Sequence, residues 1–249
     1  MAAREVRLGN YIAYGSNDFL GAGAMSIIGL WVTFFYTTYC GLSVAQAGLI
    51  VVAARLLDAF FSPLIGYISD HFHHTWPGKK FGRRRFFILL AIPLLPSFAL
   101  MWIEGQTFWY YLITYVFFEL VYAMELIPYE TLAAEMSPDY KTKAKFAGAR
   151  ILCGQIAAIL AAFLPGRIIE ALGKDSAVTF LYLGIIFSVI FMLVATFSSH
   201  RYWEFADAAA RRAQDSSFYK NTAMLGGFFF LFVCGAGGLS VDGWLRKLK

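Results

Sequence analysis

Charged residues are scarce in this chain. They make up 15% of its 249 residues, against about 25% in a typical soluble domain, whereas 59% of the residues are hydrophobic. Cysteine is also rare, and Cys40, Cys153 and Cys234 lie in or beside apolar runs without paired spacing. This excludes a disulfide framework and a cysteine-ligated metal site, and it predicts buried free thiols.

The motifs of common enzyme classes are missing as well. The chain contains no HExxH, no GxSxG and no phosphate-cradling GxxxxGK[ST] sequence. Three of its four histidines, His71, His73 and His74, lie in one loop, where a basic, solvated turn is favoured over a metal site. The sequence therefore predicts a protein that is not an enzyme and that holds no resident cofactor or metal.

Long apolar runs are abundant. A membrane-spanning helix needs roughly 20 mainly apolar residues. Six runs reach this length and a seventh follows a polar segment: 11–37, 46–70, 86–104, 107–133, 146–170, 177–198 and 222–241. We therefore predict an all-α integral membrane protein with several spans.

The basic residues between these runs gather on alternate loops. When successive loops are assigned to opposite sides of a membrane, one side receives fourteen Lys and Arg residues and the other receives one. Because cytoplasmic loops carry the excess of Lys and Arg, the N-terminus is predicted to be cytoplasmic. No cleavable signal peptide is recognisable before the first run, so a multi-pass protein of the cell membrane is expected.

The same pattern divides the chain into three segments. Residues 1–198 are predicted to form a six-helix transmembrane bundle, residues 199–221 a cytoplasmic linker with a short amphipathic helix, and residues 222–249 a seventh transmembrane segment. The terminal sequence WLRKLK would place three basic residues on the outer side, against the charge rule. We therefore expect the seventh segment to be truncated.

Asp58 lies about midway along the second run, where a charge is costly. Arg55 and Ser62 stand three residues before it and four residues after it, so the three side chains share one helical face. A carboxylate on a wet inner face can coordinate a cation or take up a proton. Coupling-ion chemistry is favoured, and a structural Arg55–Asp58 pair remains the alternative.

Other charges fall at a similar depth. Asp18, Glu125 and Asp58 lie within one slab on the cytoplasmic side of the midplane, and Arg150 lies nearer the cytoplasm. Glu125 does not share a face with Glu119 and Glu130 on its helix, so the three glutamates cannot all point into one site. A structural ion pair or a snorkelling side chain is favoured for Glu119 and Arg167, and snorkelling is an alternative for Glu130. Polar groups at mid-membrane on several spans are typical of transporters.

The segment GYISDHFHHTWPGKKFGRRR, residues 66–85, resembles an elongated form of the loop between the second and third helices of the major facilitator superfamily. The matching positions are Gly66, Asp70, Gly82, Arg83 and Arg84. The resemblance implies a charge clamp between the carboxylate and the arginines, which is remade as helices rock.

Three further segments resemble the glycoside–pentoside–hexuronide:cation symporters, the melibiose permease group, and the similarity covers about residues 10–200. They are NYIAYG, ARLLDAFFSPLIGYISD and IPYETLAAEMSPDYKTKAKFAGAR. The resemblance implies the six-helix N-terminal bundle of the major facilitator fold plus a partial seventh helix. It also implies symport of a sugar or glycoside with H⁺ or Na⁺, in a bacterial inner membrane.

The resemblance assigns the coupling site. Asp58 falls on a carboxylate of the family's cation site, and Arg55 falls on the arginine one turn earlier. The family's second carboxylate is Ser62 here, an intervening asparagine is Phe61 and a hydroxyl donor is Ala123. Proton coupling is favoured over sodium, because a proton needs one titratable group and no cage of oxygens.

The resemblance also implies a rewritten sugar site. Arg150 matches a substrate-binding arginine. Asp18 lies one turn before the position of a sugar-binding carboxylate and Glu125 lies beside the position of another, while Glu130 replaces a stacking tryptophan. Tyr122 or Tyr129 is expected to stack on a pyranose ring.

Two alternatives remain open at this point. One keeps the fold but moves a lipid or amphiphile, or acts as a sensor without transport. The other is an inactive half-transporter. The expected partners are a small sugar or glycoside, membrane lipids, and either a missing C-terminal half or a second copy, with no nucleic acid.

Overall fold

A computed structural model describes residues 8–82, 84–136, 139–172, 177–199, 212, 215–216 and 218–227. Helices dominate the described residues, and no strand occurs among them. The chain divides into two compact units, Met1–Ser199 and His200–Lys249. In the second unit residues 218–227 are helical, and the expected seventh span lies mostly outside the described residues. The prediction of an all-α membrane fold is confirmed.

The first span is a helix interrupted near its start. It comprises α1 (Leu8–Gly15), α2 (Asp18–Ile27), a π-helical turn (Ile28–Val32) and α3 (Thr33–Thr38). Ser16 and Asn17 form a turn between α1 and α2. The Asn17 side chain makes no capping hydrogen bond to α2, which leaves its amide to reach another helix.

The second span, α4 (Val44–His71), begins at a capping box in which the side chains of Ser43 and Gln46 each bond the other's backbone N–H. A 3₁₀ turn and the short helix α5 (Trp76–Phe81) follow it. Gly82 then ends α5 with φ of +86°, a left-handed conformation that favours glycine.

The third predicted span is shorter and broken. Residues 86–104 were expected to form one helix, but α6 (Arg85–Ala91) and α7 (Ser97–Leu100) are separated by a 3₁₀ turn. Pro93 and Pro96 explain the break, because each lacks a backbone N–H and clashes with the preceding turn. The apolar stretch Phe86–Leu100 falls below the length of a full span.

The remaining spans are long helices: α8 (Phe108–Met136), α9 (Tyr140–Leu172) and α10 (Val178–Ser199). Among the described residues, five stretches are long and apolar enough to cross a membrane: Leu8–Thr38, Val44–His74, Phe108–Thr131, Tyr140–Ala171 and Val178–Phe197.

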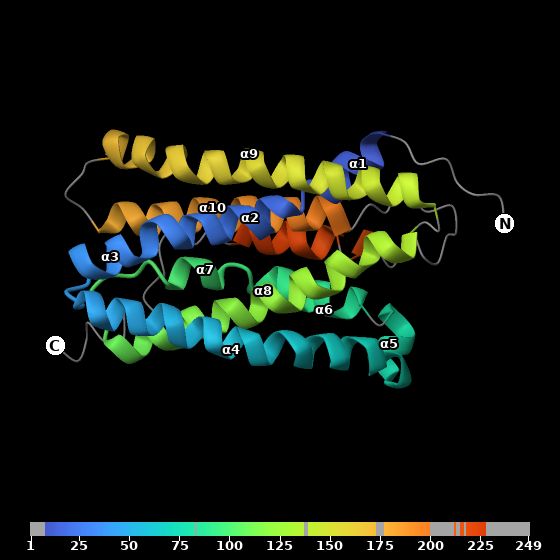
Figure 1. Ribbon diagram of the computed structural model, residues 1–249, viewed down its shortest axis with the longest axis horizontal. Helices are drawn as coiled ribbons and strands as arrows, with labels where there is room; N and C mark the ends of the chain where they lie inside the picture. Colours follow the sequence, from blue (N-terminus) through green and yellow to red (C-terminus); the bar gives the residue numbers. More distant parts are fainter. Residues whose placement is uncertain are drawn as a thin grey trace. The chain divides into compact units, whose positions relative to one another are not determined.

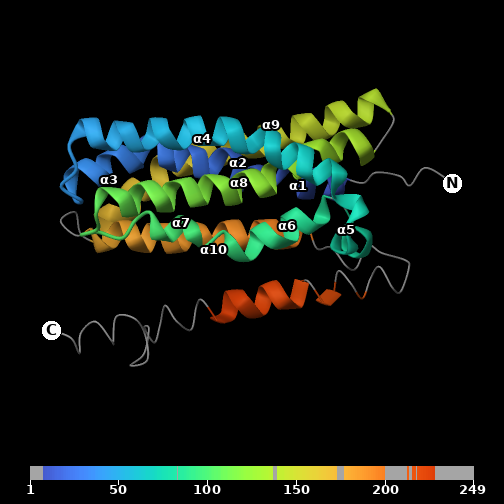
Figure 2. The same cartoon turned by 90° about the horizontal axis from the view of Figure 1, so that it is seen from below.

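The helices of the first unit run side by side (Figures 1 and 2). The first span packs on α9, α4 packs on α8, and α10 packs on α7. Aromatic rings fill the end of the bundle near α3, where Trp102 and Phe180 stack with centroids 5.9 Å apart. Phe60 on α4 and Phe163 on α9 are 75% and 72% exposed, as expected for apolar faces that meet lipid or another bundle.

A glycine allows the first span to approach α9. A Cβ atom on Gly15 would lie 2.6 Å from the carbonyl oxygen of Ala149, whereas one on Gly9 would meet nothing within 4 Å. Small residues at such points let the backbones of membrane helices come close together. The position of the first span therefore depends on Gly15.

Gly15→Ala should destabilise the bundle, because the added methyl group forces α1 away from α9. The expected cost is about 1–3 kcal/mol, the range for overpacked sites. Gly9→Ala, in the same helix, should be neutral or stabilising by up to about 1 kcal/mol through helix propensity. Thermal unfolding in detergent measures both, and equal midpoints would contradict the close approach.

Candidate functional site

Three of the four glutamates of α8 contact different parts of the bundle. Glu119 meets α4, Glu125 meets the turn before α2, and Glu130 meets α9. Glu119 and Glu130 are eleven residues apart and lie nearly in line, about three turns from each other on a helix with 3.6 residues per turn, whereas Glu125 lies on another face. The prediction that they cannot point into one site agrees with this arrangement.

Arg150 joins two of the predicted substrate residues. Its Nη2 lies 2.8 Å from Glu130 Oε1, and its Nε lies 3.5 Å from Asp18 Oδ1. The exposed fractions of the side chains are 33% for Arg150, 14% for Asp18 and 41% for Glu130. We call Asp18, Glu130 and Arg150 the Arg150 cluster. It links α2, α8 and α9 and remains accessible from outside the bundle.

Two glycines make room for the carboxylate of Asp18. A Cβ atom on Gly21, one turn later in α2, would lie 2.6 Å from Asp18 Oδ1. A Cβ atom on Gly154 of α9 would collide with the other carboxylate oxygen. The sequence therefore seats this carboxylate between α2 and α9, within reach of Arg150.

Glu125 forms a separate, buried contact beside this cluster. Its Oε1 accepts a hydrogen bond of 2.6 Å from Asn17 Nδ2, and both residues are 0% exposed. Asn17 was not among the predicted site residues. The sequence did offer a signal for Asn17, because an amide side chain stands next to Asp18 in an apolar run.

The two tyrosines that were predicted to stack on a sugar ring contact the first span instead. Tyr129 is 3% exposed, its hydroxyl donates to the Tyr14 carbonyl, and its ring stacks on that of Tyr14 with centroids 4.6 Å apart. Tyr122 donates to the Gly21 carbonyl at 3.2 Å. In this conformation Tyr129 offers no free face to a sugar.

The predicted coupling residues are arranged differently from the expectation. Arg55 Nη1 lies 3.2 Å from Glu119 Oε1, and Arg55 Nη2 donates to Met25 Sδ at 3.0 Å. Asp58 instead accepts a hydrogen bond of 2.9 Å from Ser62. The alternative of a structural Arg55–Asp58 ion pair is not realised in this conformation, in which Arg55 pairs with Glu119.

Burial explains this choice of partner. Glu119 is 1% exposed, so its charge needs a nearby cation, whereas Asp58 is only half-buried and already has a hydroxyl donor. Glu119 was expected to form a structural ion pair or to snorkel, and its ion pair with Arg55 agrees with the first of these expectations.

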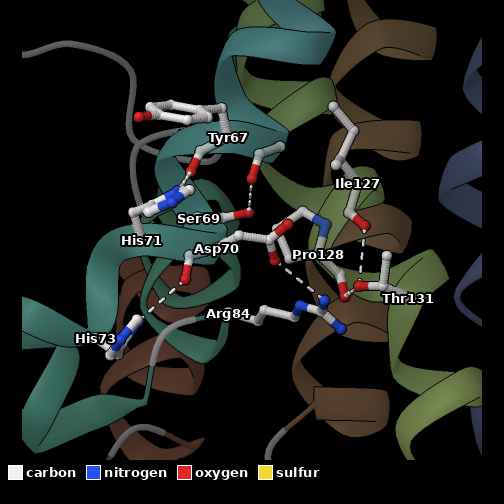
Figure 3. A network of polar contacts seen from close by, with 10 residues as sticks. Tyr67, Ser69, Asp70, His71, His73, Arg84, Ile127, Pro128 and Thr131 are labelled. Atoms are coloured by element: carbon white, nitrogen blue, oxygen red, sulfur yellow. Dashed lines mark hydrogen bonds and ion pairs between the residues drawn. The ribbon is translucent and has the colours of Figure 1, made fainter.

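The predicted charge clamp forms at the end of α4 (Figure 3). Arg84 Nη2 lies 3.2 Å from Asp70 Oδ1, and in Figure 3 the arginine lies near Pro128 and Thr131 of α8. A Cβ atom on Gly66 would lie 3.8 Å from Ile127 Cγ2, so α4 and α8 are close here. Arg83, the other predicted member, lies outside the described residues.

The neighbouring histidines bond to backbone carbonyl oxygens near the end of α4. His71 Nδ1 lies 2.9 Å from the Tyr67 carbonyl oxygen and His73 Nδ1 lies 3.1 Å from that of Asp70 (Figure 3). Within the described ranges, no group of three or more His, Cys, Asp or Glu residues could hold a metal ion. Ring nitrogens bonded in this way support a structural turn.

Comparison with known proteins finds a protein family whose sequence model matches most of the chain. A sequence model described as MFS/sugar transport protein matches residues 13–229. The chain is 26% identical over 175 residues to a glucuronide carrier protein homolog of Escherichia coli, covering 68% of this chain and 37% of that protein. It is 25% identical over 191 residues to the isoprimeverose transporter of Lactiplantibacillus pentosus, covering 73% and 39%.

A third relative covers more of the chain. An uncharacterized symporter of Synechocystis sp. is 26% identical over 224 residues, covering 82% of this chain and 39% of that protein. The matches therefore span about two-fifths of the length of these relatives.

The Arg55–Glu119 pair predicts a double-mutant cycle. Arg55→Met should lower the unfolding free energy by roughly 2 kcal/mol, below the about 3–5 kcal/mol of a fully buried pair, because Arg55 is 43% exposed. Arg55→Met with Glu119→Gln should recover most of the loss, since no buried charge is left unpaired.

The matched control is the exposed pair Arg167–Glu170 on α9, with side chains 83% and 54% exposed and 3.6 Å apart. Its removal should cost less than about 0.5 kcal/mol. Unfolding in detergent at neutral pH measures the cycle. A double variant no more stable than Arg55→Met would show that the two residues are not coupled.

Proposed function

Because the chain belongs to the MFS/sugar transport protein family, we propose that the whole protein is a symporter that couples a monovalent cation to the uptake of a sugar or glycoside by alternating access. The chain matches only about two-fifths of the length of these relatives. The proposal therefore concerns the complete transport unit and not this bundle alone. The printed names of the relatives, a glucuronide carrier protein homolog and an isoprimeverose transporter, support carbohydrate as the substrate class.

The Arg150 cluster is the observation that carries the proposal. A guanidinium group presents several donors in a fixed plane, and carboxylates accept hydrogen bonds from vicinal hydroxyl groups. Here the three side chains are 14–41% exposed, which leaves donors and acceptors for a ligand.

Asp58 is the proposed coupling residue. Among the described residues, no basic side chain forms an ion pair with its carboxylate, which has only the Ser62 hydroxyl as a partner. A half-buried carboxylate without a cation can bind a proton or a monovalent cation. The single titratable group favours the proton over Na⁺, which would need several oxygen ligands.

Alternating access supplies the remaining step. We propose that this bundle rocks against a second bundle, contributed by further chain or by another copy, with the sugar held at their interface near the Arg150 cluster. The Asp70–Arg84 clamp would break and reform during this motion on the cytoplasmic side. We propose accordingly that the protein lies in the cell membrane with its N-terminus in the cytoplasm.

Arg150→Lys should weaken sugar binding and uptake, because a lysine cannot contact Asp18, Glu130 and a ligand at the same time. We expect a loss of about tenfold to hundredfold, equivalent to the roughly 1.5–3 kcal/mol of a hydrogen bond to a charged group. Uptake of a panel of labelled glycosides, including glucuronides and isoprimeverose, measures the effect in cells that express the full gene product.

Arg167→Lys on the same helix is the matched control, because Arg167 is 83% exposed and pairs only with Glu170 among the described residues. It should transport normally. Equal uptake by the two variants would remove the Arg150 cluster from the sugar site. Uptake of lysophospholipids in place of every glycoside would make the substrate an amphiphile.

Asp58→Asn should abolish accumulation against a gradient but preserve exchange of the substrate across the membrane. The amide keeps the size of the side chain and its hydrogen bond with Ser62, yet it cannot change charge. Counterflow and uphill uptake, measured in parallel with Glu170→Gln as the control, separate the two activities. Retained accumulation in Asp58→Asn would exclude Asp58 as the coupling residue.

A further inference from the structure

The surroundings of Glu125 are unusual for an acidic side chain. The residue is 0% exposed, and Asn17 donates to its Oε1 at 2.6 Å. Its Oε2 is also buried, and no described residue forms a hydrogen bond with it. Within the described part of the chain, the carboxyl group therefore receives one hydrogen bond, from a neutral amide.

The neighbouring groups do not balance a negative charge at this position. The charged residues that act on Glu125 through their Coulomb interaction are Asp18 on α2 and Glu130 on α8, and both are acidic. Arg150 on α9 is engaged by these same two carboxylates. An ionised Glu125 would therefore add a third negative charge to a place that has one arginine.

The hydroxyl groups of the adjacent tyrosines do not compensate for a negative charge on Glu125. Tyr122 and Tyr129, on the same helix, donate their hydroxyl hydrogens to the carbonyl oxygens of Gly21 and Tyr14. An ionised carboxylate that is fully removed from water costs several kcal/mol unless a cation or several donors compensate for it. A proton on the carboxyl group removes most of that cost.

We propose that Glu125 is a proton-binding site, and that it carries a proton in this conformation. The site is separate from Asp58, which lies on α4 and is half-buried with a hydroxyl partner. It takes a proton and no metal ion, because a single carboxyl group and one amide nitrogen cannot form a coordination shell.

The turn between α1 and α2 connects this proton to the Arg150 cluster. Asn17 contacts Glu125, and the next residue, Asp18, contacts Arg150. Loss of the proton would place a charge beside Asp18 and Glu130 and disturb the turn that positions Asp18. Proton occupancy of Glu125 would thereby alter the sugar site, a consequence that rests on the proposed function.

Infrared spectroscopy of the full chain in lipid bilayers tests the proton site directly. At neutral pH the wild type should show a C=O stretching band of a protonated carboxyl group, which shifts in D₂O and is lost in Glu125→Gln. The band should remain in Glu130→Gln, a variant of the same helix, and in Asp58→Asn. A difference between wild type and Glu125→Gln only in the ionised carboxylate bands would overturn the proposal.

A second variant keeps the test informative if Glu125→Gln does not fold. Asn17→Ala removes the hydrogen bond to the carbonyl oxygen, so the same band should move to higher frequency. An unchanged band in that variant would show that the protonated group is not Glu125. These spectra need no sugar, so a failure of the transport proposal in uptake assays would be seen separately.

Discussion

A carboxylate inside a membrane-spanning bundle must be matched by a cation, by hydrogen-bond donors or by a proton, and the membrane-length stretch of α8, Phe108–Thr131, carries three carboxylates. Arg55 matches Glu119 and Arg150 matches Glu130, while Asn17 gives Glu125 a single neutral donor. These contacts tie α8 to α4, to α9 and to the turn in the first span. The positions of the helices and the chemistry of the site thus depend on the same few interactions.

The contacts differ in how accessible they are to a ligand, and this difference is the reason for proposing the sugar site at the Arg150 cluster. Glu119 and Glu125 are buried, whereas the Arg150 cluster is partly exposed. An exposed arginine shared between two carboxylates can exchange one protein contact for a ligand hydroxyl at low cost. A buried pair cannot do so without leaving a charge unpaired. We therefore propose the Arg150 cluster, and not the buried glutamates, as the ligand site.

Much of the fold could be predicted from the sequence, because membrane spans follow from the length of apolar runs and from the charges between them. The interruption of the third span also has a sequence signal in Pro93 and Pro96, but an average over the run conceals it. The Asp70–Arg84 pair was predictable from a family motif. The pairing of Arg55 was not, because Asp58 is its neighbour on the same helix whereas Glu119 is distant in sequence. The helix bounds of the structure show why the two residues meet, because each lies eleven residues after the first residue of its helix, α4 for Arg55 and α8 for Glu119.

The central claim is that a sugar and a cation move together through the protein of which this bundle forms part. Electrode recordings of lightly buffered, de-energised cells that express the full gene product test it most directly when glycosides are added. Proton-coupled uptake predicts that a transported glycoside raises the external pH, and that a protonophore abolishes the rise. Entry of glycoside with no movement of protons or sodium would contradict the account.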